Sequence, residues 1–116
     1  WLSDLVEKNS KEINLVYLDS WDLDPKAPID PALHGLNEFL TILPLLKKGC
    51  LVLVDDTPIN EDYALPVHNN DFVQKWVKSK QKYGFPPGKG SLIKQYVEFN
   101  SIGKIIEHKY QLLIKI

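Results

Sequence analysis

Two short apolar segments that each end in carboxylates constrain this chain more than any other feature. Val16–Leu18 runs directly into Asp19, and Leu51–Val54 runs into Asp55 and Asp56. An uncharged apolar run of this length is typical of a strand buried on both faces, as in a parallel sheet covered by helices. Ligands of open α/β sheets collect at the carboxyl ends of the strands, so neighbouring strands would bring these three carboxylates together. Three carboxylates at one point require a cation, or one of them must stay protonated.

Length and composition exclude several classes of protein. The chain has 116 residues, enough for one domain, and its 44% hydrophobic and 25% charged content is ordinary for a soluble globular protein. No apolar run approaches the ~20 residues that span a bilayer, so we expect no membrane partner. All fourteen basic residues are lysines and the net charge is −1, which argues against a nucleic-acid-binding face. The single cysteine, Cys50, is expected to lie in the core. A chain that cannot form an internal disulfide is expected in a reducing, cytoplasmic compartment.

The order of predicted elements is that of an α/β fold. Trp1, Leu2, Leu5 and Val6 recur at helical spacing and predict the end of a short amphipathic helix. Strands are predicted over 13–18 and 51–54, and two more, over 104–108 and 111–116, are joined tightly enough to form an antiparallel hairpin. Helices are predicted from 31 to about 46, from 72 to about 83 and from 91 to about 102. Helices between strands that run the same way are typical of α/β proteins.

The predicted helix ends rest on individual residues. Asp30 is expected to cap the first long helix with Pro31 at its first position, and Pro44 is expected to end its regular part near Leu43. Ser91 is a second candidate cap. The buried stripe of the first long helix is expected to consist of Leu33, Leu36, Phe39, Leu40, Leu43 and Leu46. The stretch from Asn60 to Asn70 is expected to be irregular.

Together these motifs resemble the C-terminal half of a class I S-adenosylmethionine-dependent methyltransferase. The matching parts are a strand followed by Leu-Asp-Ser-Trp-Asp, a helix ending in Leu-Leu-Lys-Lys-Gly, a strand followed by Val-Asp-Asp-Thr, a Gly-Lys-Gly loop before a helix, and a terminal hairpin. Within that superfamily the chain is most similar to the metal-dependent O-methyltransferases of the catechol and sugar type. The resemblance implies that Asp19, Asp55 and Asp56 are ligands of a divalent ion such as Mg²⁺. It also implies that Ser20 and Trp21 border the site of S-adenosylmethionine.

The chain departs from the pattern of that family in two places. The glycine-rich cofactor loop and the acidic residue that binds the cofactor ribose belong to the N-terminal half of that family and are missing from residues 1–116, so we expect these residues to be a single partial domain, inactive alone. The absence of methionine also favours a fragment of a longer chain. Where catechol-type enzymes carry a catalytic lysine, this chain has Asp22. Asp22 is therefore a candidate base or substrate contact, with a solvated acidic loop as the alternative.

Two further residues have a functional and an ordinary interpretation. His34 lies one turn into a helix, where the N-terminus disfavours its protonated form and suits a neutral general base; a partly buried helix histidine is the alternative. Lys89, between Gly88 and Gly90, is expected in a glycine-permitted turn before a helix, with contact to an anionic substrate at that helix's N-terminus as the alternative. The full phosphate-binding loop pattern is absent. For the three aspartates, the alternative to a metal site is a set of solvated turn and capping residues.

The leading functional hypothesis is a metal-assisted O-methyltransferase, active as part of a longer chain. Its acceptor would be a small molecule bearing a hydroxyl group, such as a sugar, a polyol or a catechol. The alternatives are a non-catalytic methyltransferase-like module for dimerisation or ligand binding, and a different Rossmann-like enzyme such as a nucleotide-sugar modifier. Phe85, in an aromatic, proline-rich loop, is expected to be a packing residue, with a loop that covers an active site or forms a contact in a homo-oligomer as the alternatives. The first strand is expected to leave an unpaired apolar edge.

Overall fold

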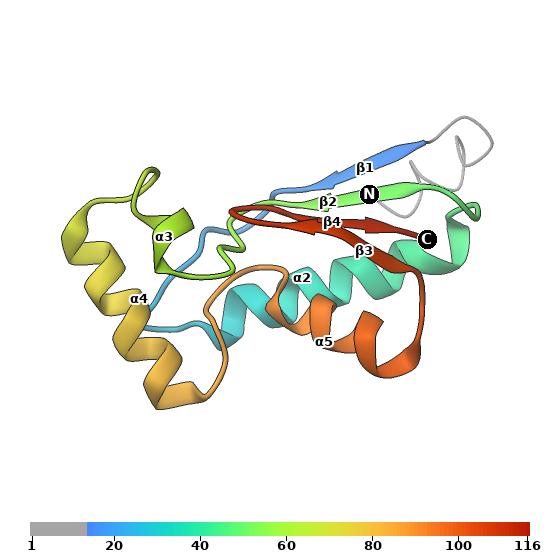
Figure 1. The fold of residues 1–116 in the computed structure, drawn as a ribbon. Helices are drawn as coiled ribbons and strands as arrows, with labels where there is room; N and C mark the ends of the chain where they lie inside the picture. The colour runs from blue at the N-terminus through green and yellow to red at the C-terminus, as the bar shows by residue number, and fades with distance from the viewer. Residues whose placement is uncertain (1–13) are drawn as a thin grey trace.

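A computed structural model of the chain describes residues 14–116. Its centre is a four-stranded mixed sheet with the order β1-β2-β4-β3 (Figure 1). The strands are β1 (Leu15–Leu18), β2 (Leu51–Val54), β3 (Lys104–His108) and β4 (Leu112–Lys115). β1 and β2 are parallel, and β4 lies antiparallel between β2 and β3. The α/β prediction with two parallel strands and a terminal hairpin is therefore confirmed, while the helix predicted near Trp1 lies outside the described residues.

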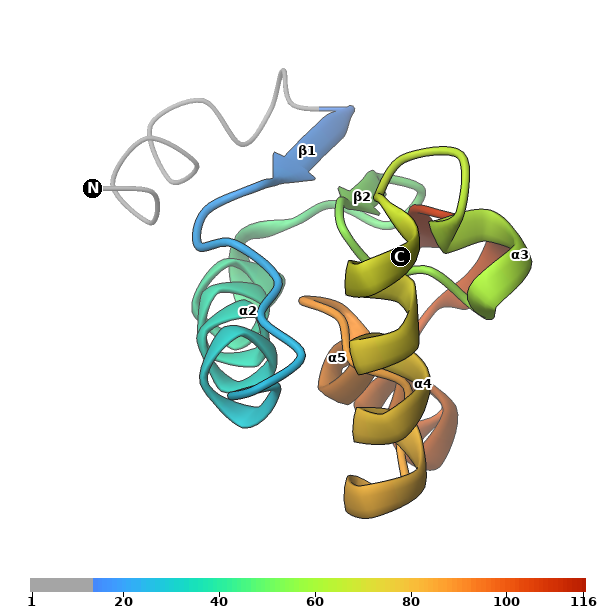
Figure 2. The same cartoon turned by 90° about the vertical axis from the view of Figure 1, so that its left-hand side faces the viewer.

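The helices gather on one face of the sheet and at one end of it. Figure 1 shows α2 and α5 beneath the strands, whereas α3 and α4 lie beyond the carboxyl ends of β1 and β2. Figure 2 looks onto that end and shows α2 and α5, which pack against each other, under the strands. None of the helices in residues 14–116 is both long and apolar enough to cross a bilayer. Their bounds are α2 Ile29–Ile42, the 3₁₀ helix η1 Leu43–Leu45, α3 Glu61–Ala64, α4 Asn70–Tyr83 and α5 Ser91–Asn100.

The core lies between the sheet and the pair α2 and α5. Alternate strand residues point into it, as the period of two requires. Cys50 is buried in it, as predicted. On the opposite face Leu15 is 55% exposed and Tyr17 is 48% exposed, so β1 presents apolar side chains at the sheet edge within residues 14–116. The main core residues are Val16, Leu18, Phe39, Ile42, Val52, Val54, Ile93, Val97, Leu112 and Ile114.

The first long helix differs from its prediction in its start and in its buried face. It begins at Ile29 with Pro28 in the capping position, so Asp30 lies in the first turn and does not cap it. Leu33 and Leu40 are 44% and 37% exposed. The reason is a close contact at Gly35, where an added Cβ would lie 2.2 Å from the carbonyl oxygen of Lys89. A helix can approach another backbone so closely only on a side that carries glycine. Gly35 therefore faces inward, and Leu33 and Leu40 face outward.

Other local predictions are partly confirmed. η1 begins at Leu43 with Pro44 inside it, as expected for a proline that ends the regular helix. Ser91 does not cap α5: Gly90 holds that position, and the Ser91 hydroxyl donates to the carbonyl of Pro86. The stretch predicted to be irregular contains α3, which Asn60 caps by accepting from the backbone N–H of Tyr63.

His108 ties the end of β3 to the loop after β2 and makes stability depend on pH. Its Nε2–H donates to the carbonyl of Thr57 at 2.7 Å, and its Nδ1 is buried without a hydrogen-bond partner among the described residues. Burial lowers the pKa of His108 below 6.5, and this effect outweighs the hydrogen bond to Thr57, which acts in the other direction. The unfolded chain therefore takes up a proton at this site at higher pH than the folded chain.

We expect the free energy of unfolding to fall as the pH is lowered from 6.5 toward the folded pKa of His108. The slope stays below about 1.4 kcal/mol per pH unit, because this site binds at most one proton more in the unfolded chain than in the folded chain. His108→Gln keeps an N–H donor and does not titrate. Between pH 7 and pH 5 the free energy of unfolding should therefore fall more in wild type than in this variant. Urea unfolding at both pH values measures it. Parallel pH profiles for the two proteins would contradict the assignment.

Candidate metal centre

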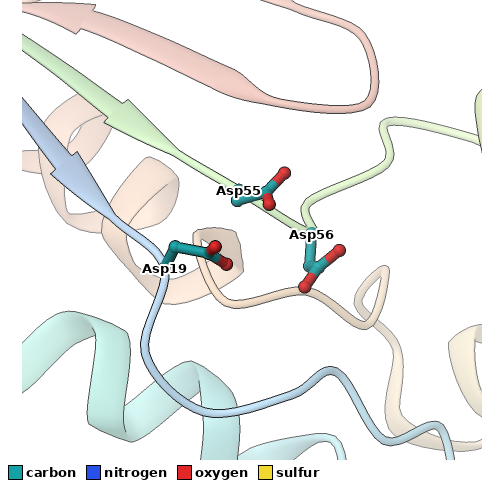
Figure 3. A group of neighbouring side chains, drawn as sticks. All are labelled: Asp19, Asp55 and Asp56. Carbon is teal, nitrogen blue, oxygen red and sulfur yellow. The ribbon is translucent and has the colours of Figure 1, made fainter.

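Asp19, Asp55 and Asp56 meet at the carboxyl ends of β1 and β2. Leu18 is the register partner of Val54, and the backbone N–H of Asp55 donates to the carbonyl of Leu18 at 3.1 Å, so both strands end at the same level. Each aspartate offers one oxygen, and the three oxygens lie within 4.8 Å of one another. Figure 3 shows the Asp19 side chain extending from the end of β1 toward Asp56. The parallel register is thus what brings together residues separated by some three dozen positions in the sequence.

A lysine ammonium lies inside this carboxylate cluster. Lys89 Nζ is 2.8 Å from Asp19 Oδ1 and 3.3 Å from Asp56 Oδ2, and the lysine side chain is only 3% exposed. Burial acts to lower the pKa of Lys89, but the hydrogen bond that the ammonium donates to Asp19 and the negative charges of Asp56 and Asp19 outweigh it and raise the pKa. The ammonium therefore remains charged at neutral pH. The loop lies before a helix, as the sequence predicts, but the Lys89 side chain contacts two carboxylates of its own chain, a contact that the sequence does not predict.

The Gly88-Lys89-Gly90 loop is packed tightly against the end of β2. A Cβ on Gly88 would lie 3.0 Å from Thr57 Cα, and one on Gly90 would lie 3.0 Å from Thr57 Oγ1. Two hydrogen bonds fix the loop: Lys89 N–H donates to the Asp56 carbonyl at 3.1 Å, and Gly90 N–H donates to Thr57 Oγ1 at 2.9 Å. On the other side of the loop, Trp76 Nε1–H donates to the carbonyl of Pro87 at 2.9 Å. The two glycines permit this approach, and the approach delivers Lys89 into the cluster.

Tyr110 of the hairpin holds Asp56 through Oδ1, whereas Lys89 contacts Oδ2. Tyr110 donates its hydroxyl proton to Asp56 Oδ1 at 2.5 Å, and the Tyr110 oxygen lies 2.8 Å from His68 Nε2. Because the Tyr110 proton is committed to the carboxylate, His68 donates through Nε2–H. Burial and the adjacent Asp56 both raise the pKa of Tyr110, so its hydroxyl remains a donor.

Asp55 is held in its ionised form by several donors. Gln111 Nε2 donates to Asp55 Oδ1 at 3.0 Å. Burial acts to raise the pKa of Asp55, but hydrogen bonds from Gln111, from the backbone of Asp56 and from Tyr17 lower it overall. The reciprocal effect is seen at Tyr17, where burial and the hydrogen bond to Asp55 raise the pKa to about 12. Asp55 contributes to the cluster without contacting Lys89 through a hydrogen bond or ion pair in the described residues.

The donor set fits a hard divalent cation. In their ordinary ionised forms the cluster has three carboxylates and one ammonium, which leaves two negative charges uncompensated. Carboxylate oxygens are the ligands that Mg²⁺ prefers, and Mg²⁺ usually retains several waters beside a few carboxylates. Asp19, Asp55 and Asp56 would therefore hold such an ion. Two of these carboxylates, Asp19 and Asp56, are the ones that Lys89 contacts.

A second polar group surrounds the segment that follows Asp19. Ser20 Oγ donates to Glu38 Oε1 at 2.6 Å and lies 2.9 Å from His34 Nε2. The ring of Trp21 lies 5.1 Å from that of His34, and Trp21 is 57% exposed with a φ of 72°. A tryptophan in this left-handed region is strained, and such strain persists only where the surroundings fix it. The structure thus brings together three of the predicted site residues, while Asp22 is exposed outside these contacts.

Sequence reasoning missed the roles of several residues. Glu38 carried a usable signal, because it follows His34 by four positions on a helix and the two are 3.4 Å apart. The glycines that flank Lys89 indicated a close backbone approach, although not its target. Tyr110 and Gln111 carried no local signal, because they reach the cluster through the antiparallel pairing of the hairpin with β2.

Comparisons of the chain with protein-family models, with curated proteins and with solved structures gave no match.

Proposed function

We propose that this chain provides the acceptor-binding part of an S-adenosylmethionine-dependent O-methyltransferase that uses a divalent ion. The observation that carries the proposal is the convergence of Asp19, Asp55 and Asp56 at the ends of two parallel strands. The resemblance in sequence assigns those same residues to the metal, and the parallel pair with an antiparallel terminal hairpin agrees with it. A candidate metal centre at that edge also agrees with where α/β sheets bind their ligands.

The chain's own residues have separate tasks in this proposal. When bound, a divalent ion would favour the ionised form of an acceptor hydroxyl and fix its position for attack on the sulfonium methyl group. Lys89 and Tyr110 hold Asp56, and Gln111 holds Asp55, so the ligands are oriented before any ion binds. Ser20 and Trp21 border the cofactor. His34, oriented by Ser20, and the exposed Asp22 are the candidates that receive the acceptor proton.

We favour a vicinal diol of a sugar or polyol as the acceptor over a catechol. The loop from Asp22 to Pro28 is acidic, and the exposed part of it offers carboxylates to hydroxyl groups. A catechol would instead require an apolar wall on both sides of its ring.

Transfer of a labelled methyl group tests the proposal. The natural protein that contains this chain is incubated with S-adenosylmethionine and with a sugar, an acyclic polyol or a catechol, in Mg²⁺ or in EDTA. We expect transfer to a vicinal diol that EDTA abolishes and added Mg²⁺ restores. Transfer that EDTA leaves unchanged would contradict the role of the metal, and no transfer to any of the three acceptors would contradict the proposed reaction.

One observation favours a second candidate, a non-catalytic module in which the cluster is purely structural. Each of the three carboxylates already has a partner within the chain, namely Lys89 for Asp19 and Asp56 and Gln111 for Asp55. Such a network would join the loop before α5 to both strand ends without a metal. This second candidate predicts that calorimetry detects no binding of Mg²⁺ and that the protein does not bind S-adenosylmethionine.

A further inference from the structure

We propose that Lys89 is a resident cation of the carboxylate cluster, that it competes directly with a divalent ion for Asp19 and Asp56, and that it thereby sets the metal affinity of the site. The inference rests on the proposed metal function and deepens it. It assigns to Lys89 a positioning and regulating task that is distinct from contact with a substrate.

The competition follows from the contacts. Lys89 Nζ lies 2.8 Å from Asp19 Oδ1 and 3.3 Å from Asp56 Oδ2, so the ammonium occupies the space between two of the three candidate ligands. Mg²⁺ requires its ligand oxygens at about 2.0–2.1 Å in near-octahedral geometry. An ion at that distance from the same oxygens would lie close to Nζ, and the two positive charges would repel each other beside a lysine side chain that is only 3% exposed. Binding therefore requires the lysine side chain to leave these oxygens.

Close contacts and hydrogen bonds fix the backbone of the Gly88-Lys89-Gly90 loop. Gly35 of α2 and Gly88 and Gly90 of the loop each allow a contact that a Cβ would block. The Lys89 N–H is held by Asp56 and the Gly90 N–H by Thr57. Only the side chain of Lys89 is left to move. The ammonium is thus a tethered competitor whose effective concentration at the cluster is fixed by the fold.

This arrangement has a consequence for the ion-free protein. Without Lys89, Asp19, Asp55 and Asp56 would repel one another and separate. With it, Asp19 and Asp56 are held near each other by a common positively charged partner. The cost is a weaker site, because each ion must displace the ammonium before it gains its full set of ligands.

Lys89→Met tests the inference, since methionine keeps much of the length of the side chain and removes its charge. We expect the affinity of this variant for Mg²⁺ and Mn²⁺ to exceed that of wild type by more than about tenfold. Calorimetry measures binding of both ions, and electron paramagnetic resonance measures free Mn²⁺. Lys94→Met, which removes a half-buried lysine of α5 outside the cluster, should bind as wild type does. Asp55→Asn introduced into the Lys89→Met protein should cancel the gain.

The failures of the two proposals are distinguishable. If wild type binds no ion while Lys89→Met does, the competition by Lys89 stands and the metal-dependent function falls. If wild type and Lys89→Met bind equally tightly, the function stands and the competition falls. Should Lys89→Met fail to fold, Lys89→Gln, which retains a donor for the carboxylates, replaces it. If neither variant folds even in millimolar Mg²⁺, the inference is overturned, because the ion should then substitute for the ammonium.

Discussion

Replacing Asp55 by asparagine should lower kcat/KM for methyl transfer by at least about a hundredfold while leaving the fold intact. The substitution removes one of the three carboxylate charges of the cluster. It leaves the carbonyl oxygen that Gln111 contacts, and it does not disturb the ion pairs of Lys89 with Asp19 and Asp56. Loss of activity would therefore report on the candidate metal centre and not on the packing around Lys89.

Asp71→Asn is the matched control for Asp55→Asn. Asp71 lies in the first turn of α4, is largely exposed and pairs with Lys75 at 2.9 Å on the same helix. Its substitution removes the same charge from the protein but not from the cluster, so activity should stay within about twofold of wild type, as for other exposed ion pairs. Equal activity of the Asp55 and Asp71 variants would exclude Asp55 from the reaction.

Gly35→Ala should lower the free energy of unfolding by about 2–3 kcal/mol. The sign of this effect is informative, because glycine to alanine within a helix normally stabilises by up to about 1 kcal/mol. Here the new Cβ would lie 2.2 Å from the carbonyl oxygen of Lys89, and that oxygen belongs to a loop fixed by hydrogen bonds on both sides. Either α2 or the loop must shift, and both movements loosen the core or displace Lys89.

Urea unfolding of Gly35→Ala beside Asn37→Ala measures the effect. Asn37 is exposed on the same helix, so its substitution should change stability by no more than about 0.7 kcal/mol, in the stabilising direction. Mg²⁺ affinity measured on both variants shows whether the shift reaches the cluster. Stabilisation of the Gly35 variant would show that the contact between α2 and the Lys89 loop is not close.

The strands were predictable because their signal is local. Leu51–Val54 lies where the sequence predicts it, since five consecutive apolar residues between Gly49 and two aspartates fit few other structures. The tight connection after His108 likewise predicted the hairpin. The convergence of Asp19 with Asp55 then followed from one assumption, that the first two strands are parallel neighbours, which the register confirms.

The interior of the site was not predictable, because it depends on contacts between distant segments. A lysine in a glycine-rich loop normally extends into solvent. The sequence of residues 84–90 contains no signal that Lys89 points inward and contacts two carboxylates. The prediction of which face of α2 is buried was wrong for a related reason. Leu33 and Leu40 have the spacing of a buried stripe, but the approach of the Lys89 loop to Gly35 decides which face packs inward. Hydrophobic spacing alone does not contain that steric condition.

The most direct test of the account is a calorimetric titration of the protein with Mg²⁺, with Asp55→Asn as its partner. We predict one ion bound per chain by wild type, and no binding by the variant. A wild-type protein that binds no Mg²⁺ at millimolar concentration, or that binds it as tightly after Asp55→Asn, would contradict the assignment of Asp19, Asp55 and Asp56 as a metal centre.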